Sequence, residues 1–120
     1  MITHVKFVGI PTRDQAAALV FWTEKIGFTV TTDHPMGAQR WIELATPDGE
    51  TGVALFTPDG QADRIGTFFN GAFTCADVEA TYRELVGRGV TFTEPPTRQP
   101  WGSYAKFQDP DGNIFVLSSR

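Results

Sequence analysis

Apolar and polar residues alternate along short stretches of the chain, and turn residues separate these stretches. A period of two residues is typical of a strand with one buried face. In the first half, the alternation predicts strands at residues 3–10, 28–32, 40–45 and 53–57. In the second half, it predicts strands at residues 72–75, 90–93, 104–107 and 114–118. Each half therefore supplies four strands.

One segment in each half has helical spacing instead. Apolar residues recur every three or four positions, at 19, 22 and 26 in the first segment and at 78, 82 and 85 in the second. Asp14 and Asp77 precede these segments and are good N-caps, while Gly27 and Gly89 follow them and are typical of helix ends. Two helices are predicted, each lying between the first and second strands of its half.

The two halves also repeat each other in sequence. GFTV at residues 27–30 recurs as GVTF 62 positions later, and PDG at residues 47–49 recurs 63 positions later. Asp48 and Asp111 in these PDG segments are predicted turn residues, and Pro95, Pro96 and Pro100 predict an irregular loop before the last hairpin. The repeat predicts one domain, 1–120, made of two β-α-β-β-β modules at 1–57 and 67–120 with a linker at 58–66.

Alternation within the strands, matched across the repeat, predicts which side chains share a face. The face toward the helices is expected to hold Ile42, Leu44, Ala54, Phe56, Ala105, Phe107, Phe115 and Leu117. The opposite face is expected to hold Val5, Phe7, Trp41, Glu43, Val53, Leu55, Asn70, Ala72, Tyr104, Lys106, Ile114 and Val116. A sheet face open to water is normally mostly polar. This largely apolar face must therefore be covered by the other module, by a second chain or by a ligand.

Composition narrows the class of protein. The 120 residues carry 10 basic and 14 acidic side chains, a net charge of −4, and no basic stripe, so we expect no nucleic-acid partner. One cysteine, Cys75, excludes an internal disulfide. No apolar run approaches the ~20 residues of a membrane span, and no signal sequence is recognisable at the start. We expect a cytoplasmic protein with no membrane partner.

Motifs along nearly the whole chain carry a resemblance to a known family. They are VGIPTRD (8–14), FWTEKIGF (21–28), DVEATY (77–82), RGV (88–90), PWG (100–102) and DPDGN (109–113). In this order, within two β-α-β-β-β modules, they resemble the vicinal oxygen chelate superfamily, which includes glyoxalases, bleomycin resistance proteins and extradiol dioxygenases. The resemblance implies an α+β fold with two βαβββ modules and cupped mixed sheets. It implies no single activity, because one fold hosts many functions.

The resemblance also implies where a metal would be bound. Enzymes of the family hold a divalent metal in the cup through His, Glu or Gln at four places, which fall here on Phe7, Leu55, Asn70 and Val116. Three of these side chains carry no donor atom, and the neighbouring strand residues are no better. We therefore expect no metal and no other cofactor. In glyoxalase-like relatives the cup forms across two chains, which implies a homodimer.

The remaining candidates each have a structural and a functional interpretation. Glu43 and Lys106 form a structural ion pair, or are two solvated groups at the mouth of the cup. Alternatively they anchor a ligand, or handle protons if burial shifts a pKa. Trp41 and Tyr104 are core or dimer contacts, or aromatic walls for a ligand, and Trp101 anchors its loop or borders the cup.

Three further residues are weaker candidates for a functional site. Cys75 is expected to be a buried, inert thiol. His4 is expected to be structural or exposed, and His34 is expected to lie in a loop.

The leading hypothesis is a metal-free protein that binds a small organic molecule in an aromatic-lined cup. Its expected ligand-binding residues are Phe7, Trp41, Glu43, Leu55, Asn70, Trp101, Tyr104, Lys106 and Val116. The alternative is a lyase, isomerase or dioxygenase-type enzyme of the same superfamily, with a non-standard or metal-independent site that uses Glu43 and Lys106. A third hypothesis is a domain without a ligand, in which the protein's own side chains fill the cup.

Overall fold

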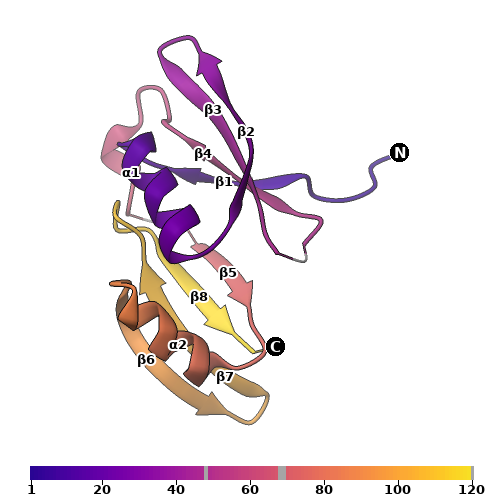
Figure 1. Ribbon diagram of the computed structural model, residues 1–120, viewed down its shortest axis with the longest axis vertical. Helices are drawn as coiled ribbons and strands as arrows, with labels where there is room; N and C mark the ends of the chain where they lie inside the picture. Colours follow the sequence, from indigo (N-terminus) through magenta and orange to yellow (C-terminus); the bar gives the residue numbers. More distant parts are fainter. Residues whose placement is uncertain (48, 68–69, 120) are drawn as a thin grey trace. The chain divides into compact units, whose positions relative to one another are not determined.

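The computed structural model describes residues 1–47, 49–67 and 70–119, and the side chain of Asn70 lies outside the described part. Asp48, predicted as a turn residue, also lies outside it. Contacts divide the chain into two compact units, Met1–Ile65 and Gly66–Arg120, which we call the first and second modules. Each module contains an α-helix and a four-stranded sheet (Figure 1), which confirms the predicted α+β fold of two βαβββ modules.

The first module follows the predicted order of elements. These are β1 (Phe7–Pro11), α1 (Gln15–Val20), a π-helical turn η1 (Phe21–Lys25), β2 (Thr29–Met36), β3 (Gln39–Ala45), β4 (Gly52–Phe56) and a 3-10 turn η2 (Ala62–Arg64). The strands lie in the order β1-β4-β3-β2. β1 is parallel to β4, and the other neighbouring pairs are antiparallel, so the sheet is mixed.

The second module repeats this arrangement. Its elements are β5 (Asn70–Thr74), α2 (Val78–Gly87), β6 (Thr91–Gln99), β7 (Gly102–Gln108) and β8 (Ile114–Ser118). The strand order is β5-β8-β7-β6, with β5 parallel to β8. The second sheet therefore has the same topology as the first, as the sequence repeat predicted.

The predicted helix boundaries have a local cause in both modules. The carboxylates of Asp14 and Asp77 accept hydrogen bonds from the backbone amides three residues later, at 3.0 and 3.1 Å. These bonds satisfy amides that have no partner within the helix. Gly27 and Gly89 follow the helices with φ of 98° and 87°, which glycine adopts without steric cost.

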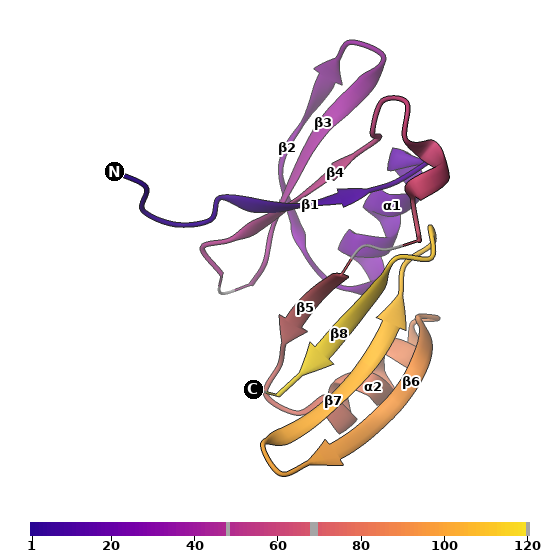
Figure 2. The same ribbon diagram turned by 180° about the vertical axis from the view of Figure 1, so that it is seen from behind.

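Each sheet packs one face against the helix of its own module (Figure 1). In the first module the buried residues of this layer include Ile10, Trp22, Ile42, Leu44, Val53 and Leu55. In the second they include Leu85, Ala105, Phe107, Phe115 and Leu117. Figure 2 shows the reverse side of the sheets, turned away from α1 and α2. We call this side the open face of each module.

The predicted faces are right for β3, β7 and β8 but wrong for β4. Ala54 lies opposite Glu43 on the open face, while Val53 and Leu55 lie opposite Leu44 and Ile42 on the helix side. Residues 53–56 are all apolar, so alternation gave no information on their direction. Ala54, not Leu55, is therefore the first-module counterpart of Val116.

Two strands run further than predicted, through prolines. β2 extends to Met36 past Pro35, so His34 lies in a strand and not in the predicted loop. β6 extends to Gln99 past Pro95 and Pro96, with register shifts between residues 92 and 97 in place of the predicted irregular loop. Both are edge strands, where proline is tolerated because no further strand needs its missing amide.

Smaller differences concern the ends of the first helix and strand. The helix predicted to run to Ile26 changes from α-helical to π-helical geometry after Val20, and β1 begins at Phe7, not at Thr3. Among the described residues, no helix has the length and apolar character needed to cross a membrane.

Candidate functional site

A hollow of about 400 Å³ lies on the open face of the first module. It is lined by Phe7, Gly9, Met36, Gln39, Trp41, Ala54 and Phe56. Gly9 and Ala54 are neighbours in the register of β1 and β4 and form a floor without bulky side chains. Three aromatic residues supply the walls. Small central residues surrounded by rings give this face its concave shape.

The aromatic walls are held by direct contacts. The rings of Phe7 and Trp41 meet edge to face, with centroids 5.7 Å apart. The indole Nε1–H of Trp41 donates a hydrogen bond to Oε2 of Glu43 at 2.8 Å. A Cβ at Gly9 would lie only 3.0 Å from the ring of Phe56, so that ring lies close against the floor. The rings are therefore positioned before any ligand arrives.

The polar groups around the hollow already have protein partners. Both amide atoms of Gln39 bind the backbone of Thr57, whose carbonyl accepts at 3.1 Å and whose amide donates at 2.9 Å. Glu43 accepts from Trp41, and its other oxygen lies 3.8 Å from Nζ of the exposed Lys6. Recognition in this hollow therefore rests mainly on shape and apolar contact.

The open face of the second module carries a polar cluster instead. The Tyr104 hydroxyl donates to Oε1 of Glu94 at 2.7 Å, and Nζ of Lys106 lies 3.5 Å from Oε2 of Glu94. The hydrogen bond to Glu94 is the main reason that the pKa of Tyr104 lies above its ordinary value. Trp101 lies in the β6–β7 turn, 53% exposed, and stacks on Tyr104 with ring centroids 6.1 Å apart.

The structure brings some predicted ligand-binding residues together within a module. Phe7, Trp41 and Glu43 share the open face of the first module, and Tyr104, Lys106 and Val116 share that of the second. Leu55 was assigned to the wrong face, since it is 1% exposed on the helix side.

The other predicted positions need separate statements. Asn70 pairs with Ile114 in β5, but its side chain lies outside the described part. Cys75 is half-buried, and His4 is exposed beside Thr3 before β1 begins.

Sequence reasoning missed five lining residues, namely Gly9, Met36, Gln39, Ala54 and Phe56. His34, expected in a loop, lies opposite Trp41 in the register of β2 and β3 but does not line the hollow. The register error in β4 hid Ala54 and Phe56, and Pro35 hid the end of β2. The sequence did distinguish Gln39 from its counterpart, because the matching position 63 residues later holds a glycine, Gly102. This difference between the two halves could have marked Gln39 as a candidate.

The positions implied for a metal do not fit one. Phe7, Ala54, which replaces Leu55 after the register correction, and Val116 carry no donor atoms. Among the residues that the structure describes, no group of three or more His, Cys, Asp or Glu side chains is arranged to hold a metal.

Comparison with known proteins agrees with this fold over nearly the whole chain. Residues 2–117 match the family model described as the Glyoxalase/Bleomycin resistance protein/Dioxygenase superfamily. YetH of Bacillus subtilis, named as an uncharacterized protein, is 35% identical over 118 residues, 98% of each chain.

Solved structures give the same result. UcmS2 superposes with a TM-score of 0.90 and 32% identity over 100% of both chains. TnmS3, an antibiotic binding protein from Streptomyces sp. CB03234, superposes with a TM-score of 0.86 and 33% identity, covering 98% of this chain and 95% of that one. The fold, the family match and these relatives together show that the chain belongs to the glyoxalase/bleomycin resistance protein/dioxygenase superfamily.

Proposed function

We propose that this protein binds a small, flat, mainly apolar organic molecule in the hollow of the first module, without a metal ion. The observation that carries the proposal is the hollow itself, about 400 Å³ with a floor of Gly9 and Ala54 and aromatic walls. Ring systems stack on or meet the edges of such walls favourably. A volume of this size lies at the lower end of the range for small-molecule sites.

The chemistry of the open face supports binding without a metal. At the places where the family's enzymes carry metal ligands, Phe7, Ala54 and Val116 offer only carbon atoms. Apolar side chains at these places favour contact with an organic molecule instead.

Relatives support the same class of function. TnmS3, which resembles this chain over nearly its full length, is an antibiotic binding protein. An antibiotic-like organic molecule is therefore the class of ligand that we propose for the hollow.

Binding is favoured over the enzymatic alternative because the candidate proton-handling groups already have bonding partners in the protein. Glu43 accepts the Trp41 indole hydrogen bond, and Lys106 pairs with Glu94. Neither is presented to the hollow as an unpaired acid or base.

A thermal-shift and tryptophan-fluorescence screen with neutral compounds of two to four fused rings tests the proposal. We expect at least one compound to bind, and Trp41→Ala to weaken it at least ten-fold. Val86→Ala, a change at an exposed apolar residue of α2, should leave affinity unchanged. Failure of every compound to bind, or full affinity in the Trp41→Ala variant, would contradict the proposal.

The same sample distinguishes binding from turnover, and it tests the role of Trp101. Mass spectrometry of the bound compound after prolonged incubation should return its original mass, whereas a changed mass would favour the enzymatic alternative. Trp101→Ala should weaken binding if this residue borders the ligand, as the sequence analysis predicts.

Elemental analysis tests the metal-free part of the proposal. We expect no stoichiometric zinc, nickel, iron or manganese in the purified protein, and unchanged ligand affinity after chelation. About one such ion per chain, together with loss of binding after chelation, would contradict it.

We further propose that the protein is a cytoplasmic homodimer. The open faces carry apolar side chains such as Phe7, Ile114 and Val116, which are only half-buried. Covering such side chains fully stabilises a protein by about 1.5–3 kcal/mol each. Light scattering at micromolar concentration should give the mass of a dimer, and a monomer mass would contradict this proposal.

A further inference from the structure

The pairing of β3 with β4 stops early at the end that borders the hollow. The two strands pair from Leu44 opposite Val53 to Ile42 opposite Leu55. Continuing that register would place Trp41 opposite Phe56 and Arg40 opposite Thr57, and neither pair forms between the described residues. Trp41 and Phe56 are both walls of the hollow, so the interruption lies directly at the site.

Two glutamine side chains take the hydrogen bonds that the missing pair would have made. Gln15 donates from Nε2 to the carbonyl oxygens of Arg40 at 2.7 Å and Leu55 at 3.0 Å, and its Oε1 accepts from the Arg40 amide at 2.9 Å. Gln39 binds the amide and carbonyl of Thr57 in the same way, at 2.9 and 3.1 Å. Each side-chain amide thus stands where a backbone peptide would otherwise bind. We call this pair the glutamine wedge.

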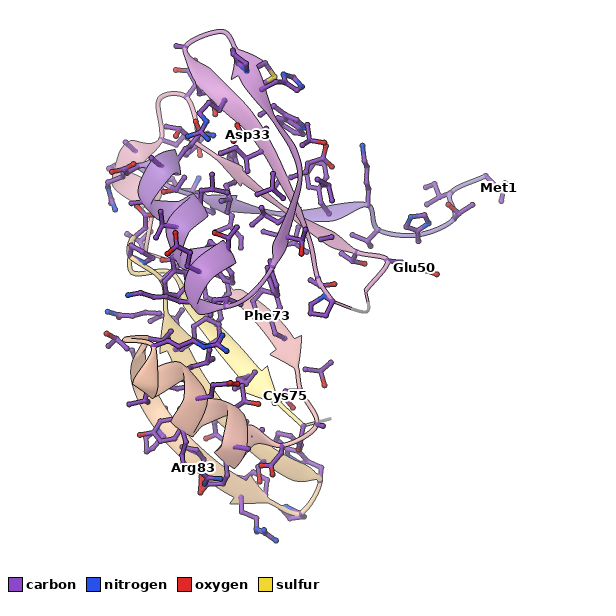
Figure 3. All side chains as sticks on the ribbon, viewed as in Figure 1. Met1, Asp33, Glu50, Phe73, Cys75 and Arg83 are labelled. Atoms are coloured by element: carbon purple, nitrogen blue, oxygen red, sulfur yellow. The ribbon has the colours of Figure 1, made fainter. Side chains whose placement is uncertain are left out.

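The strands on either side of the wedge are tied to their outer neighbours. The Thr57 hydroxyl donates to the Thr12 carbonyl at 3.0 Å, and the Thr12 amide donates to the Phe56 carbonyl at 2.9 Å. On the other side, the Arg40 guanidinium donates to both carboxylate oxygens of Asp33 on β2, at 3.0 and 2.6 Å (Figure 3 labels Asp33). The gap between β3 and β4 is therefore held from both sides.

The second module shows the same strands without a wedge. Matching positions 62 or 63 residues later put Ser103 in the place of Arg40 and Ser119 in the place of Thr57. There the Ser119 amide donates directly to the Ser103 carbonyl at 3.1 Å, the Ser103 amide donates to the Ser119 hydroxyl at 3.0 Å, and Tyr104 pairs with Ser118. The second module has neither glutamine, since Val78 matches Gln15 and Gly102 matches Gln39. The glutamines and the open strand pair occur together.

We propose that Gln15 and Gln39 are positioning residues that hold β3 and β4 apart, and that the width they set selects a flat ring system entering edge-on between Trp41 and Phe56. This inference rests on the function proposed above. The two glutamines make five hydrogen bonds with the backbone of Arg40, Leu55 and Thr57, where a closed Arg40–Thr57 pair would make two. Ordering the two side chains costs rotational freedom, which offsets part of this gain. The geometric consequence of the wedge is the separation of the strands that carry the two aromatic walls.

The test removes the wedge in the full-length protein with Gln15→Val/Gln39→Ala. With the wedge gone, we expect direct Arg40–Thr57 hydrogen bonds, which NMR detects as a new contact between the Hα protons of Trp41 and Phe56. Facing residues of a non-hydrogen-bonded pair approach to about 4.5 Å between Cα atoms, close enough for this signal. The thermal midpoint should change by only a few degrees, because the two new backbone bonds and the side-chain freedom regained offset much of the loss of the glutamine bonds. Gln61→Ala, a change at an exposed glutamine, should alter neither signal.

Ligand affinity provides the second measurement. With acridone as a flat neutral probe and 1-adamantanol as a compact one, we expect the wild-type protein to prefer acridone at least ten-fold. The double variant should lose at least ten-fold in acridone affinity. An unchanged acridone affinity would overturn the inference. So would a loss of affinity with a lower thermal midpoint and no new Hα contact, since the glutamines would then be merely structural.

The two proposals fail in different ways. If Trp41→Ala abolishes acridone binding but the double variant binds normally, the wedge inference fails alone. If the wild-type protein binds neither probe and no compound of the wider screen, the proposed function fails, and the proposed role of the wedge fails with it.

Discussion

The first module has small residues at the centre of its open face, where the second module has larger ones. Gly9 and Ala54, which face each other in β1 and β4, match Ala72 and Val116 in the second module. At the end of β4 the difference is reversed, because Phe56 matches Ser118. Small residues in the middle of β1 and β4 and a large one at the end of β4 make a hollow without any change in topology.

The two modules also differ in how the PDG turn is fixed. In the second, the buried Asp109 carboxylate accepts hydrogen bonds from the amides of Asp111 and Asn113 at 3.0 and 2.9 Å, and from Nδ2 of Asn113 at 2.9 Å. Burial raises the pKa of Asp109, and the bonds from Asn113 oppose that rise. Thr46 matches Asp109 in the first module, and among the described residues its hydroxyl donates to the Thr51 carbonyl at 3.5 Å. The second module is thus the more firmly anchored at this turn.

The largest effect should come from removing that anchor. Asp109→Ala removes the acceptor of three hydrogen bonds at a buried turn, so we expect a loss of about 3 kcal/mol in the free energy of unfolding. Thr46→Ala, the matched change in the first module, should cost less than about 1 kcal/mol. Urea unfolding measures both, and equal losses would show that the two turns do not differ in anchoring.

A smaller loss should follow from adding a methyl group at the start of β4. Ile114 occupies the matching place in β8, but a Cβ at Gly52 would lie 2.7 Å from the carbonyl oxygen of Leu44. Backbone must move to relieve this clash, so Gly52→Ala should cost about 2 kcal/mol. Gly87→Ala in α2 meets no atom within 4 Å and should be neutral or stabilise by up to about 1 kcal/mol. If chemical denaturation ranks the two variants the other way, the start of β4 is not as tightly packed against Leu44 as we infer.

Giving the first module the floor of the second should affect ligand binding more than stability. Gly9→Ala places a Cβ 3.0 Å from the Phe56 ring, which must shift toward the hollow. We expect about a ten-fold loss of ligand affinity, equivalent to about 1.4 kcal/mol, with stability changed by less than about 1 kcal/mol. Titration calorimetry with a compound from the screen checks this. Undiminished affinity would mean that the Phe56 ring does not border the ligand.

The smallest expected effect is a change in the titration of Tyr104 in the second module. The first module has Trp41, which does not titrate, at the matching position. The hydrogen bond to Glu94 holds the pKa of Tyr104 above its ordinary value, so the phenol stays protonated to higher pH. Glu94→Gln should shift the tyrosine absorbance titration to lower pH. Superimposable titration curves would show that the bond does not persist in solution.

Much of the fold could be predicted because its signals are local. The N-caps at Asp14 and Asp77 and the glycines after the helices act within a few residues of themselves. Alternation oriented β3 and β7 correctly because their two faces differ in polarity. The same method failed in β4, where Val53, Ala54 and Leu55 are all buried and all apolar. One face of β4 packs in the helix layer and the other forms the floor of the hollow. Both faces are apolar, so residue polarity does not show which way each side chain points.

The candidate site depended on contacts between residues far apart in the chain. β2 and β6 can continue through Pro35 and Pro95 because both strands lie at the edges of their sheets. Strand order is a property of the folded sheet that no local sequence pattern encodes. Comparing the two halves shows Gln15 in the place of a valine, which marks it as unusual. That its amide binds the backbone of Arg40 and Leu55, 25 and 40 residues away, follows only once α1 lies against the sheet. Sequence patterns are set by each residue's own neighbours, whereas the hollow forms where side chains of β1, β2, β3 and β4 come together in the folded sheet.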